Sequence, residues 1–238
     1  VFDIRNPSPR RLWLRSLLSK EAAGFFQMRR THVLGSSVLV SESTAIGSVD
    51  FLNSHSLVYR TGSTLRTVSA ATGETIWTRD RISPESLIFG DELRLSVVSL
   101  RNAHCQLFDI RTGTLLAEHF DIPLNGILAT VGTDPIVRQI RSSTHLVSRF
   151  DMRSGIPIWE YELPGTAMVR PDNGNRLVEL HRDGQILIRE QSTGSVIIEV
   201  QGQKQLLPGV FFIHETPTGY VLFTATPQQD FQSQIRPL

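Results

Sequence analysis

Four of the Thr-Gly and Ser-Gly pairs in this chain follow one another at nearly constant spacing. The glycines are Gly73, Gly113, Gly155 and Gly194, so the intervals between them are 40, 42 and 39 residues. Each pair lies between two strand-like runs, where a glycine can take the positive φ of a hairpin tip without a Cβ penalty. A period of about 40 to 45 residues is typical of a four-stranded β-propeller blade. The spacing therefore predicts an all-β fold built from equivalent units.

Two further apolar runs precede each of the last three hairpins, which predicts four strands per period. These runs are residues 87–89 and 93–98, 127–131 and 136–140, and 167–169 and 177–180. Residues 158–163 alternate instead, with Trp159 and Tyr161 on one face and Glu160 and Glu162 on the other. This alternation predicts an outermost strand, whose carboxylates keep its edge from pairing with another molecule.

The turns carry a resemblance to a known repeat family. Asp109 and Asp151 stand near the end of the strand before a turn, and Trp77 and Trp159 stand four residues after a turn glycine. The same positions in the remaining units hold other residues, namely Ser69 and Glu190 in place of aspartate and Ala117 and Ile198 in place of tryptophan. Over roughly residues 45–225, this pattern resembles the pyrroloquinoline-quinone-type β-propeller repeat.

The resemblance has two functional implications, because this repeat occurs in quinone-dependent dehydrogenases and also in cofactor-free propellers such as outer-membrane-assembly lipoproteins. It implies that the dehydrogenases commonly clamp their quinone with a vicinal disulfide and a stacking tryptophan, beside a calcium ion. Cys105 is the only cysteine, so this chain cannot form such a disulfide by itself. We therefore expect a member closer to the cofactor-free propellers, with no cofactor. The resemblance alone implies a periplasmic or cell-envelope location.

Both ends of the chain fall inside a unit. Residues 2–5 repeat the Phe-Asp-Ile-Arg sequence of residues 108–111. Residues 209–215 and 220–225 are expected to be the first two strands of a unit that lacks its hairpin. The terminal halves either complete one blade between them, giving about five blades, or bound an arc cut from a larger ring. We favour the arc, because families with this repeat usually have more blades.

Residues 15–44 do not fit the period, and we expect them to form a helical or irregular insertion between blades. Apolar residues recur there near helical spacing, namely Leu14, Leu17, Leu18, Ala22, Phe25 and Phe26. Residues 1–30 hold seven Arg and Lys against two acidic residues, a net charge of +5. We interpret the segment as packing its apolar face on the propeller. The alternative is a basic amphipathic helix that binds an anionic surface or nucleic acid.

The composition is that of a folded domain without common catalytic motifs. With 238 residues, 40% hydrophobic and 20% charged, and a net charge of +1, the chain can bury a substantial core. No apolar run approaches the roughly 20 residues that span a bilayer, so no transmembrane segment is expected. The sequence has no phosphate-binding loop, serine nucleophile elbow, zinc-binding His-Glu-x-x-His or Cys-x-x-Cys motif.

Each residue that could carry chemistry also has a structural interpretation, which we favour. Asp109 and Asp151 could be calcium ligands or general bases, but their shared repeat position favours turn hydrogen bonds. Trp77 and Trp159 could stack on a ligand, but their equivalence favours packing between blades. Of the seven histidines only His104 adjoins the cysteine, and neighbouring side chains in a strand point to opposite faces. No catalytic, cofactor-binding or metal-binding residue is therefore expected.

The sequence predicts that residues 1–238 are a single β-propeller domain or segment that is not an enzyme. Its expected role is a protein-interaction or scaffolding module, which binds a protein partner or neighbouring domains of the same polypeptide, because repeated blades present variable loops on a rigid frame. Nucleic acid is not an expected partner. The alternatives are a quinone-dependent dehydrogenase, since soluble sugar dehydrogenases lack the vicinal disulfide, and anionic-surface or nucleic-acid binding through the basic N-terminal segment.

Overall fold

The computed structural model describes much of the chain, and every described element is a strand. The described backbone covers residues 2–3, 10–11, 28–34, 37–43, 49–124, 126–172, 175–201, 210–216, 219–225 and 236–237. Side chains are described for residues 53–124, 126–172 and 175–201. The predicted all-β class is confirmed over these residues. Among them, no helix with the length and apolar character of a membrane span is found.

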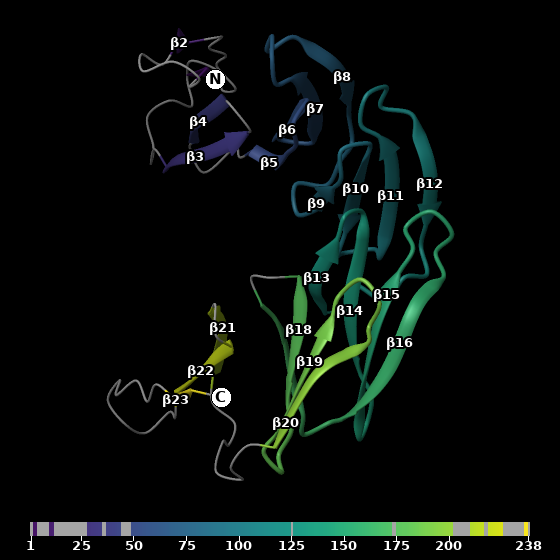
Figure 1. Cartoon of the computed structure of the whole chain (residues 1–238). Coiled ribbons are helices and arrows are strands. Elements are labelled where there is room, and N and C mark those ends of the chain that lie inside the picture. The colour runs from purple at the N-terminus through teal and green to yellow at the C-terminus, as the bar shows by residue number, and fades with distance from the viewer. Residues whose placement is uncertain are drawn as a thin grey trace. The chain divides into compact units, whose positions relative to one another are not determined.

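The chain divides into two compact units. The first comprises Val1–Ile122 with the hairpin tip Met152–Gly155, and the second comprises Pro123–Asp151 with Ile156–Leu238. Each unit contains three of the sheets labelled in Figure 1.

The first sheet of the first unit has the order β2-β1-β4-β3. Its strands are β1 (Phe2–Asp3), β2 (Arg10–Arg11), β3 (Met28–Leu34) and β4 (Ser37–Ser43). β3 and β4 lie in the range expected to be a helical or irregular insertion, residues 15–44. Residues 28–34 and 37–43 differ from that expectation, because their backbones pair as antiparallel strands. The apolar residues with helical spacing lie outside the described residues.

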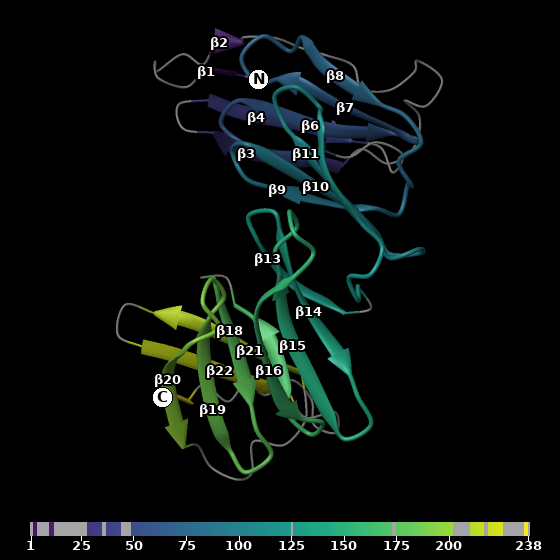
Figure 2. The ribbon, with the colours of Figure 1, turned by 90° about the vertical axis from the view of Figure 1, so that its right-hand side faces the viewer.

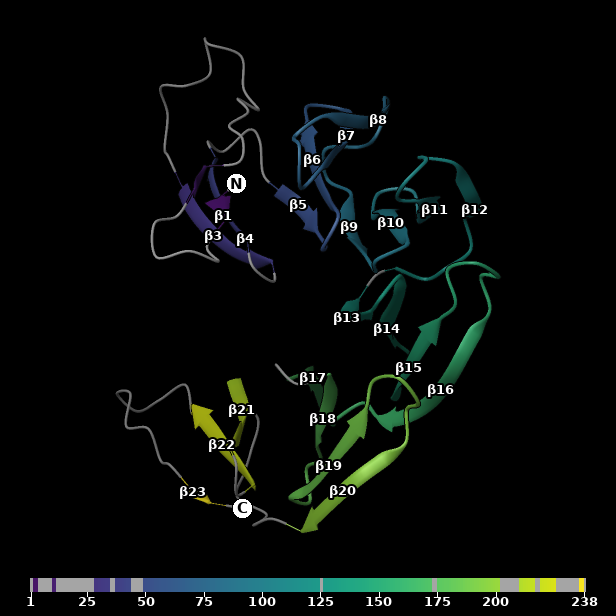
Figure 3. The same cartoon turned by 45° about the horizontal axis from the view of Figure 1, so that its top comes forward.

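The other two sheets of the first unit are antiparallel meanders in chain order, which is the topology of a propeller blade. One comprises β5 (Val49–Leu52), β6 (Ser56–Thr61), β7 (Thr64–Ser69) and β8 (Thr75–Arg79). The other comprises β9 (Leu87–Gly90), β10 (Arg94–Ser99), β11 (His104–Asp109) and β12 (Leu115–His119). The first strands of the two meanders, β5 and β9, lie against each other, and Figure 3 shows the succession of strands.

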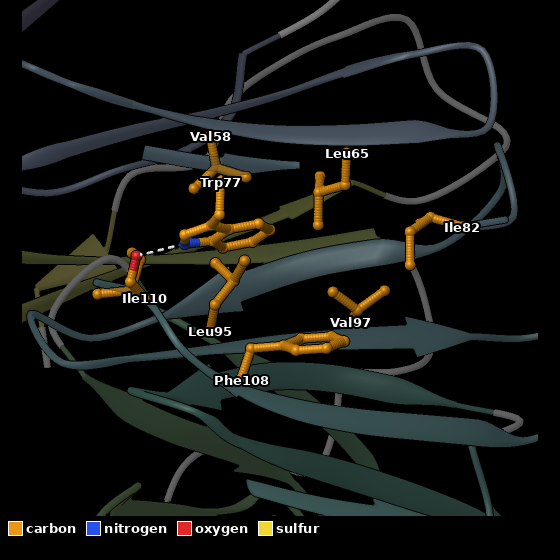
Figure 4. Close-up of a cluster of buried hydrophobic side chains, with 8 residues drawn as sticks. All are labelled: Val58, Leu65, Trp77, Ile82, Leu95, Val97, Phe108 and Ile110. Atoms are coloured by element: carbon orange, nitrogen blue, oxygen red, sulfur yellow. Dashed lines mark hydrogen bonds between the residues drawn. The ribbon is translucent and has the colours of Figure 1, made fainter. Parts of the chain in front are cut away.

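A buried apolar cluster joins these two meanders. Val58 and Leu65 come from the first meander, whereas Leu95 and Phe108 come from the second (Figure 4). Trp77 of β8 belongs to the same cluster and lies among the side chains of the second meander. The strands that contribute to the cluster are therefore covered by a neighbouring sheet, which explains their nearly continuous apolar runs.

The second unit contains two further meanders. The first comprises β13 (Ile127–Val131), β14 (Asp134–Ile140), β15 (Thr144–Phe150) and β16 (Pro157–Pro164), which run side by side in Figure 2. The second comprises β17 (Met168–Pro171), β18 (Arg176–Leu180), β19 (Gln185–Glu190) and β20 (Val196–Gln201). Their first strands, β13 and β17, lie against each other, as β5 and β9 do in the first unit. Each of the six predicted apolar runs of the last three meanders overlaps a strand.

Strand β16 is the outermost strand of its sheet, as its alternating sequence predicts. Trp159 and Tyr161 are partly buried and Leu163 is 2% exposed, whereas Glu160 and Glu162 are exposed. The alternation therefore separates a face packed on the next sheet from a solvated face.

The last sheet comprises β21 (Val210–Thr216), β22 (Gly219–Ala225) and β23 (Arg236–Pro237). β21 and β22 pair antiparallel, which confirms the two strands expected near the C-terminus. The described residues thus form five four-stranded sheets and one three-stranded sheet, in agreement with about five blades.

Candidate functional site

The four turn glycines occupy equivalent positions, as the repeat predicts. Each lies between the third and fourth strands of its meander and has a positive φ: 76° at Gly73, 69° at Gly113, 73° at Gly155 and 71° at Gly194. The backbone N–H groups of Gly73, Gly113 and Gly194 each donate to the carbonyl four residues earlier, at 2.8 Å. The left-handed backbone and this bond close the hairpin in the same way in separate units.

Asp109 makes the expected turn hydrogen bonds. Its Oδ1 accepts from the backbone N–H groups of Arg111 and Thr112, both at 2.9 Å. The Thr112 backbone bond is the largest cause of a lowered Asp109 pKa, because it stabilises the charged carboxylate. The Asp109 backbone N–H donates to Thr114, and the Asp151 N–H donates equivalently to Ile156. These bonds give Asp109 a structural role in its turn.

The two matching tryptophans pack against the next meander of their own unit. The Trp77 indole N–H donates to the carbonyl of Ile110 at 2.7 Å (Figure 4), and the Trp159 indole N–H donates to the carbonyl of Gln191 at 3.1 Å. Both acceptors stand three residues before the next turn glycine. The prediction of packing between blades is thereby confirmed for Trp77 and Trp159.

Each tryptophan also covers that next turn glycine. A Cβ added at Gly113 would lie 2.7 Å from Trp77, and one added at Gly194 would lie 2.9 Å from Trp159. Where Ala117 replaces the tryptophan, a Cβ at Gly155 would instead lie 2.7 Å from His119, two residues further along the strand. Glycine is therefore required here both for its φ and for the close approach of a ring.

The neighbours His104 and Cys105 do not form a joint site. Cys105 is fully buried, and burial raises the pKa of its thiol to about 11. His104 points to the opposite face, where its Nε2 lies 2.6 Å from Oε1 of Glu118. This bond is the largest cause of a lowered Glu118 pKa. Among the residues with described side chains, no three His, Cys, Asp or Glu groups gather into a metal-binding cluster.

The first unit contains a hollow of about 270 Å³, which we call the β8–β12 hollow. One wall is formed by the end of β8 and the following loop, including Arg79, Asp80 and Arg81. The other wall comes from β10 to β12, including His104 and Leu115. Phe108 and Val97 contribute apolar surface, so the hollow offers both polar and apolar contacts.

Several polar side chains of the β8–β12 hollow are fixed in position by hydrogen bonds within the first unit. Arg79 Nη2 donates to the carbonyl of Gly113 at 2.6 Å, and its guanidinium lies 5.7 Å from the centre of the Phe108 ring. Asp80 accepts from the hydroxyl of Thr64 at 2.8 Å. Arg81 and Leu115, in contrast, are exposed, and Arg81 makes no ion pair with any residue whose side chain is described.

The second unit contains a buried ion cluster at repeat positions that correspond to part of the apolar cluster of the first unit. Glu179 is 0% exposed, and its Oε1 lies 2.6 Å from Nε of Arg189. His181 Nε2 lies 3.4 Å from the other carboxylate oxygen. The Arg189 guanidinium also lies 4.1 Å from the centre of the Tyr161 ring. Burial is the main cause of a raised Tyr161 pKa, and the nearby Glu179 carboxylate raises it further.

The repeat itself carries a signal for this cluster, although no catalytic or metal-binding motif does. Arg189 pairs with Leu177 across its sheet, as Phe108 pairs with Leu95. By the same register, Glu179 occupies the place of Val97. Two charged residues therefore replace two apolar core residues at equivalent positions. The replacement is visible once strand register is known.

No protein-family model matches the chain, and no curated protein matches it. Among solved structures, the chain is similar to the crystal structure of BamB from Moraxella catarrhalis, with 18% identity and a TM-score of 0.38, over 71% of this chain and 55% of that one. It is also similar to the computationally designed Ika8 protein, with 13% identity and a TM-score of 0.37, over 73% and 53%. The chain thus spans about half the length of these two solved chains.

Proposed function

We propose that this chain is a non-catalytic β-propeller module that binds a protein partner or holds neighbouring domains of a longer polypeptide. We place it outside the cytoplasm on the repeat resemblance alone. The candidate contact surface is the β8–β12 hollow.

Polar side chains that line this hollow are hydrogen-bonded to other parts of the same unit, and this supports the proposal. Arg79, Asp80 and His104 each make a bond of 2.8 Å or less to another part of the same unit. A catalytic acid, base or nucleophile has to be positioned against a substrate atom, whereas these groups are used to hold the sheets and loops. The exposed Leu115 and Arg81 remain as one apolar and one charged contact, a combination suited to protein recognition.

The hairpin positions offer a matched pair of variants for testing this surface. Leu115 and Val196 both stand two residues after a turn glycine, and each is 42% exposed. Leu115 lines the hollow, whereas Val196 serves as the control outside it. We expect Leu115→Arg to abolish crosslinking between the intact protein and its partner from a photoreactive residue at Asn102, and Val196→Arg to leave the crosslink unchanged.

Two results would contradict the proposal. Equal loss of the crosslink in both variants would show that the hollow is not the contact surface. Dye reduction by the purified intact protein with pyrroloquinoline quinone and calcium would show that the module is catalytic, and it would favour the dehydrogenase alternative.

A further inference from the structure

Arg138 is a partly buried cation without a counterion in the described structure. It lies on β14, and its Nε atom is shielded from solvent without a hydrogen-bond partner. No ion pair joins its guanidinium to a carboxylate among the residues with described side chains. Burying an uncompensated charge is costly, so such a group is a candidate for binding an anion.

His145, which lies beside Arg138, also has a ring nitrogen that is buried without a hydrogen-bond partner. His145 pairs with Ile140 across the sheet, and Ile140 is two residues from Arg138. Paired residues share a face and so do residues two apart, which places His145 and Arg138 on the same face as diagonal neighbours. The Nδ1 atom of His145 is also buried without a partner. Two nitrogen-bearing side chains with unused hydrogen-bonding atoms therefore lie together.

The carboxylates of the surrounding strands are already occupied. On the same face of this sheet, Asp134 pairs with Arg149 at 2.6 Å. On the sheet packed against it, Glu179 pairs with Arg189 and lies near His181. Across β16, His145 faces the apolar Leu163. None of these carboxylates is therefore left to neutralise Arg138.

The position is also open to an entering ligand. A hollow of about 470 Å³ is lined by Pro123, Arg138, Gln139 and Ile140, all in the second unit. Ile140 is 74% exposed at its edge. A small group entering this hollow reaches a residue that carries an uncompensated positive charge.

We propose that Arg138, with His145 beside it, binds one oxyanion group, a carboxylate or a phosphate, through this hollow. A guanidinium presents paired donors that fit the oxygens of either group, and charge-assisted bonds of this kind are the strong ones. This site is separate from the β8–β12 hollow, so it stands or falls independently of the proposed function.

His145 supplies a direct readout of binding. Burial lowers the pKa of its imidazole, and the positive charge of Arg138 lowers it further. An anion bound to Arg138 cancels part of that field, so the His145 pKa should rise when the site is filled. The ring signals of His145, assigned with His145→Gln, can be followed by NMR at fixed ionic strength.

Titration with inorganic phosphate and, separately, with acetate tests the proposal and distinguishes the two ligand chemistries. We expect a saturable shift with at least one probe, with a dissociation constant on the order of 1 mM for a site with a few charge-assisted bonds. Arg138→Gln should weaken binding by at least about tenfold. Arg141→Gln is the control, because Arg141 lies three residues away and already pairs with Glu162 at the surface.

Three outcomes overturn the proposal. A wild-type shift that does not saturate with either probe would show that no site exists, and this result does not depend on any variant folding. An equal saturable shift in Arg138→Gln would show that Arg138 is not the anchor. Saturation without a rise in the His145 pKa would show that the anion binds elsewhere.

Discussion

The guanidinium of Arg189 lies over the ring of Tyr161, 4.1 Å from its centre, and links two neighbouring meanders of the second unit. The equivalent pair in the first unit has the residue types exchanged, since Arg79 of the preceding meander lies over Phe108 of the following one. Arg79 and Tyr161 both stand six residues after a turn glycine, and Phe108 and Arg189 both stand five residues before the next. The repeat thus conserves a cation–aromatic contact while reversing its direction.

The reversed arrangement predicts that a second substitution restores most of the stability that is lost through Arg189→Phe. Arg189→Phe alone leaves Glu179 buried without its guanidinium partner, which should cost about 3 to 5 kcal/mol in the free energy of unfolding. Glu179→Val combined with Arg189→Phe reproduces the Val97 and Phe108 arrangement of the first unit and should recover most of that loss. Urea denaturation followed by tryptophan fluorescence measures both variants.

The control for this experiment is the exposed Arg141–Glu162 pair, whose side chains are 51% and 56% exposed. Arg141→Met should change the free energy of unfolding by less than about 1 kcal/mol. A double variant as unstable as Arg189→Phe alone would contradict the explanation based on buried charge.

Substitutions at Gly113 and Gly62 distinguish the stability cost of a left-handed backbone from the cost of a steric clash. Both have positive φ, 69° and 59°, but a Cβ at Gly113 would lie 2.7 Å from Trp77, whereas a Cβ at Gly62 has nothing within 4 Å. Gly62→Ala should therefore cost about 1 to 2 kcal/mol from the left-handed backbone alone. Gly113→Ala should cost about 1 to 3 kcal/mol more, because the indole must move. Equal losses in thermal or urea denaturation would show that the ring contact contributes nothing.

Cys105 should be unreactive in the folded protein. Its side chain is fully buried and its pKa is raised to about 11, so the thiolate is scarce and inaccessible at pH 8. Iodoacetamide at pH 8 should label the thiol slowly under native conditions and rapidly in urea, as measured by intact-mass spectrometry. Labelling at the same rate in both conditions would contradict the burial of this residue.

Asp109 should stabilise the fold in a pH-dependent way. Its pKa is lowered in the folded state, so its contribution is present above the ordinary carboxyl pKa of about 3.9 and is lost as the pH falls through the folded-state value. Asp109→Asn should therefore be less stable than the wild type at pH 6, and the difference should shrink in acid. Asp121→Asn, at an exposed position without a hydrogen bond to the described side chains, should show no such trend. A difference for Asp109→Asn that persists unchanged at low pH would contradict the charged-turn interpretation.

Local chemistry made the repeated hairpins predictable from the sequence. Gly73 and its three counterparts need a positive φ, and this requirement depends on residues within a few positions of the turn. The apolar runs and the alternation of β16 likewise follow from side-chain period alone. The sequence therefore determined the strand order, the turn type and the faces of the outer strand.

The tertiary structure decided what depends on the register in which successive strands pair and on the sheet that packs against them. Glu179 and Arg189 become a buried pair because β18 and β19 align them with the places of Val97 and Phe108. Arg138 and His145 likewise meet only through the pairing of β14 with β15. The strands β3 and β4 were not anticipated, because the expectation for residues 15–44 followed from apolar residues with helical spacing up to Phe26, whereas residues 28–34 and 37–43 pair as a hairpin. A shift of one residue in any of these registers would turn the side chains of that strand to the opposite face, which is why the sequence alone did not reveal these charged clusters.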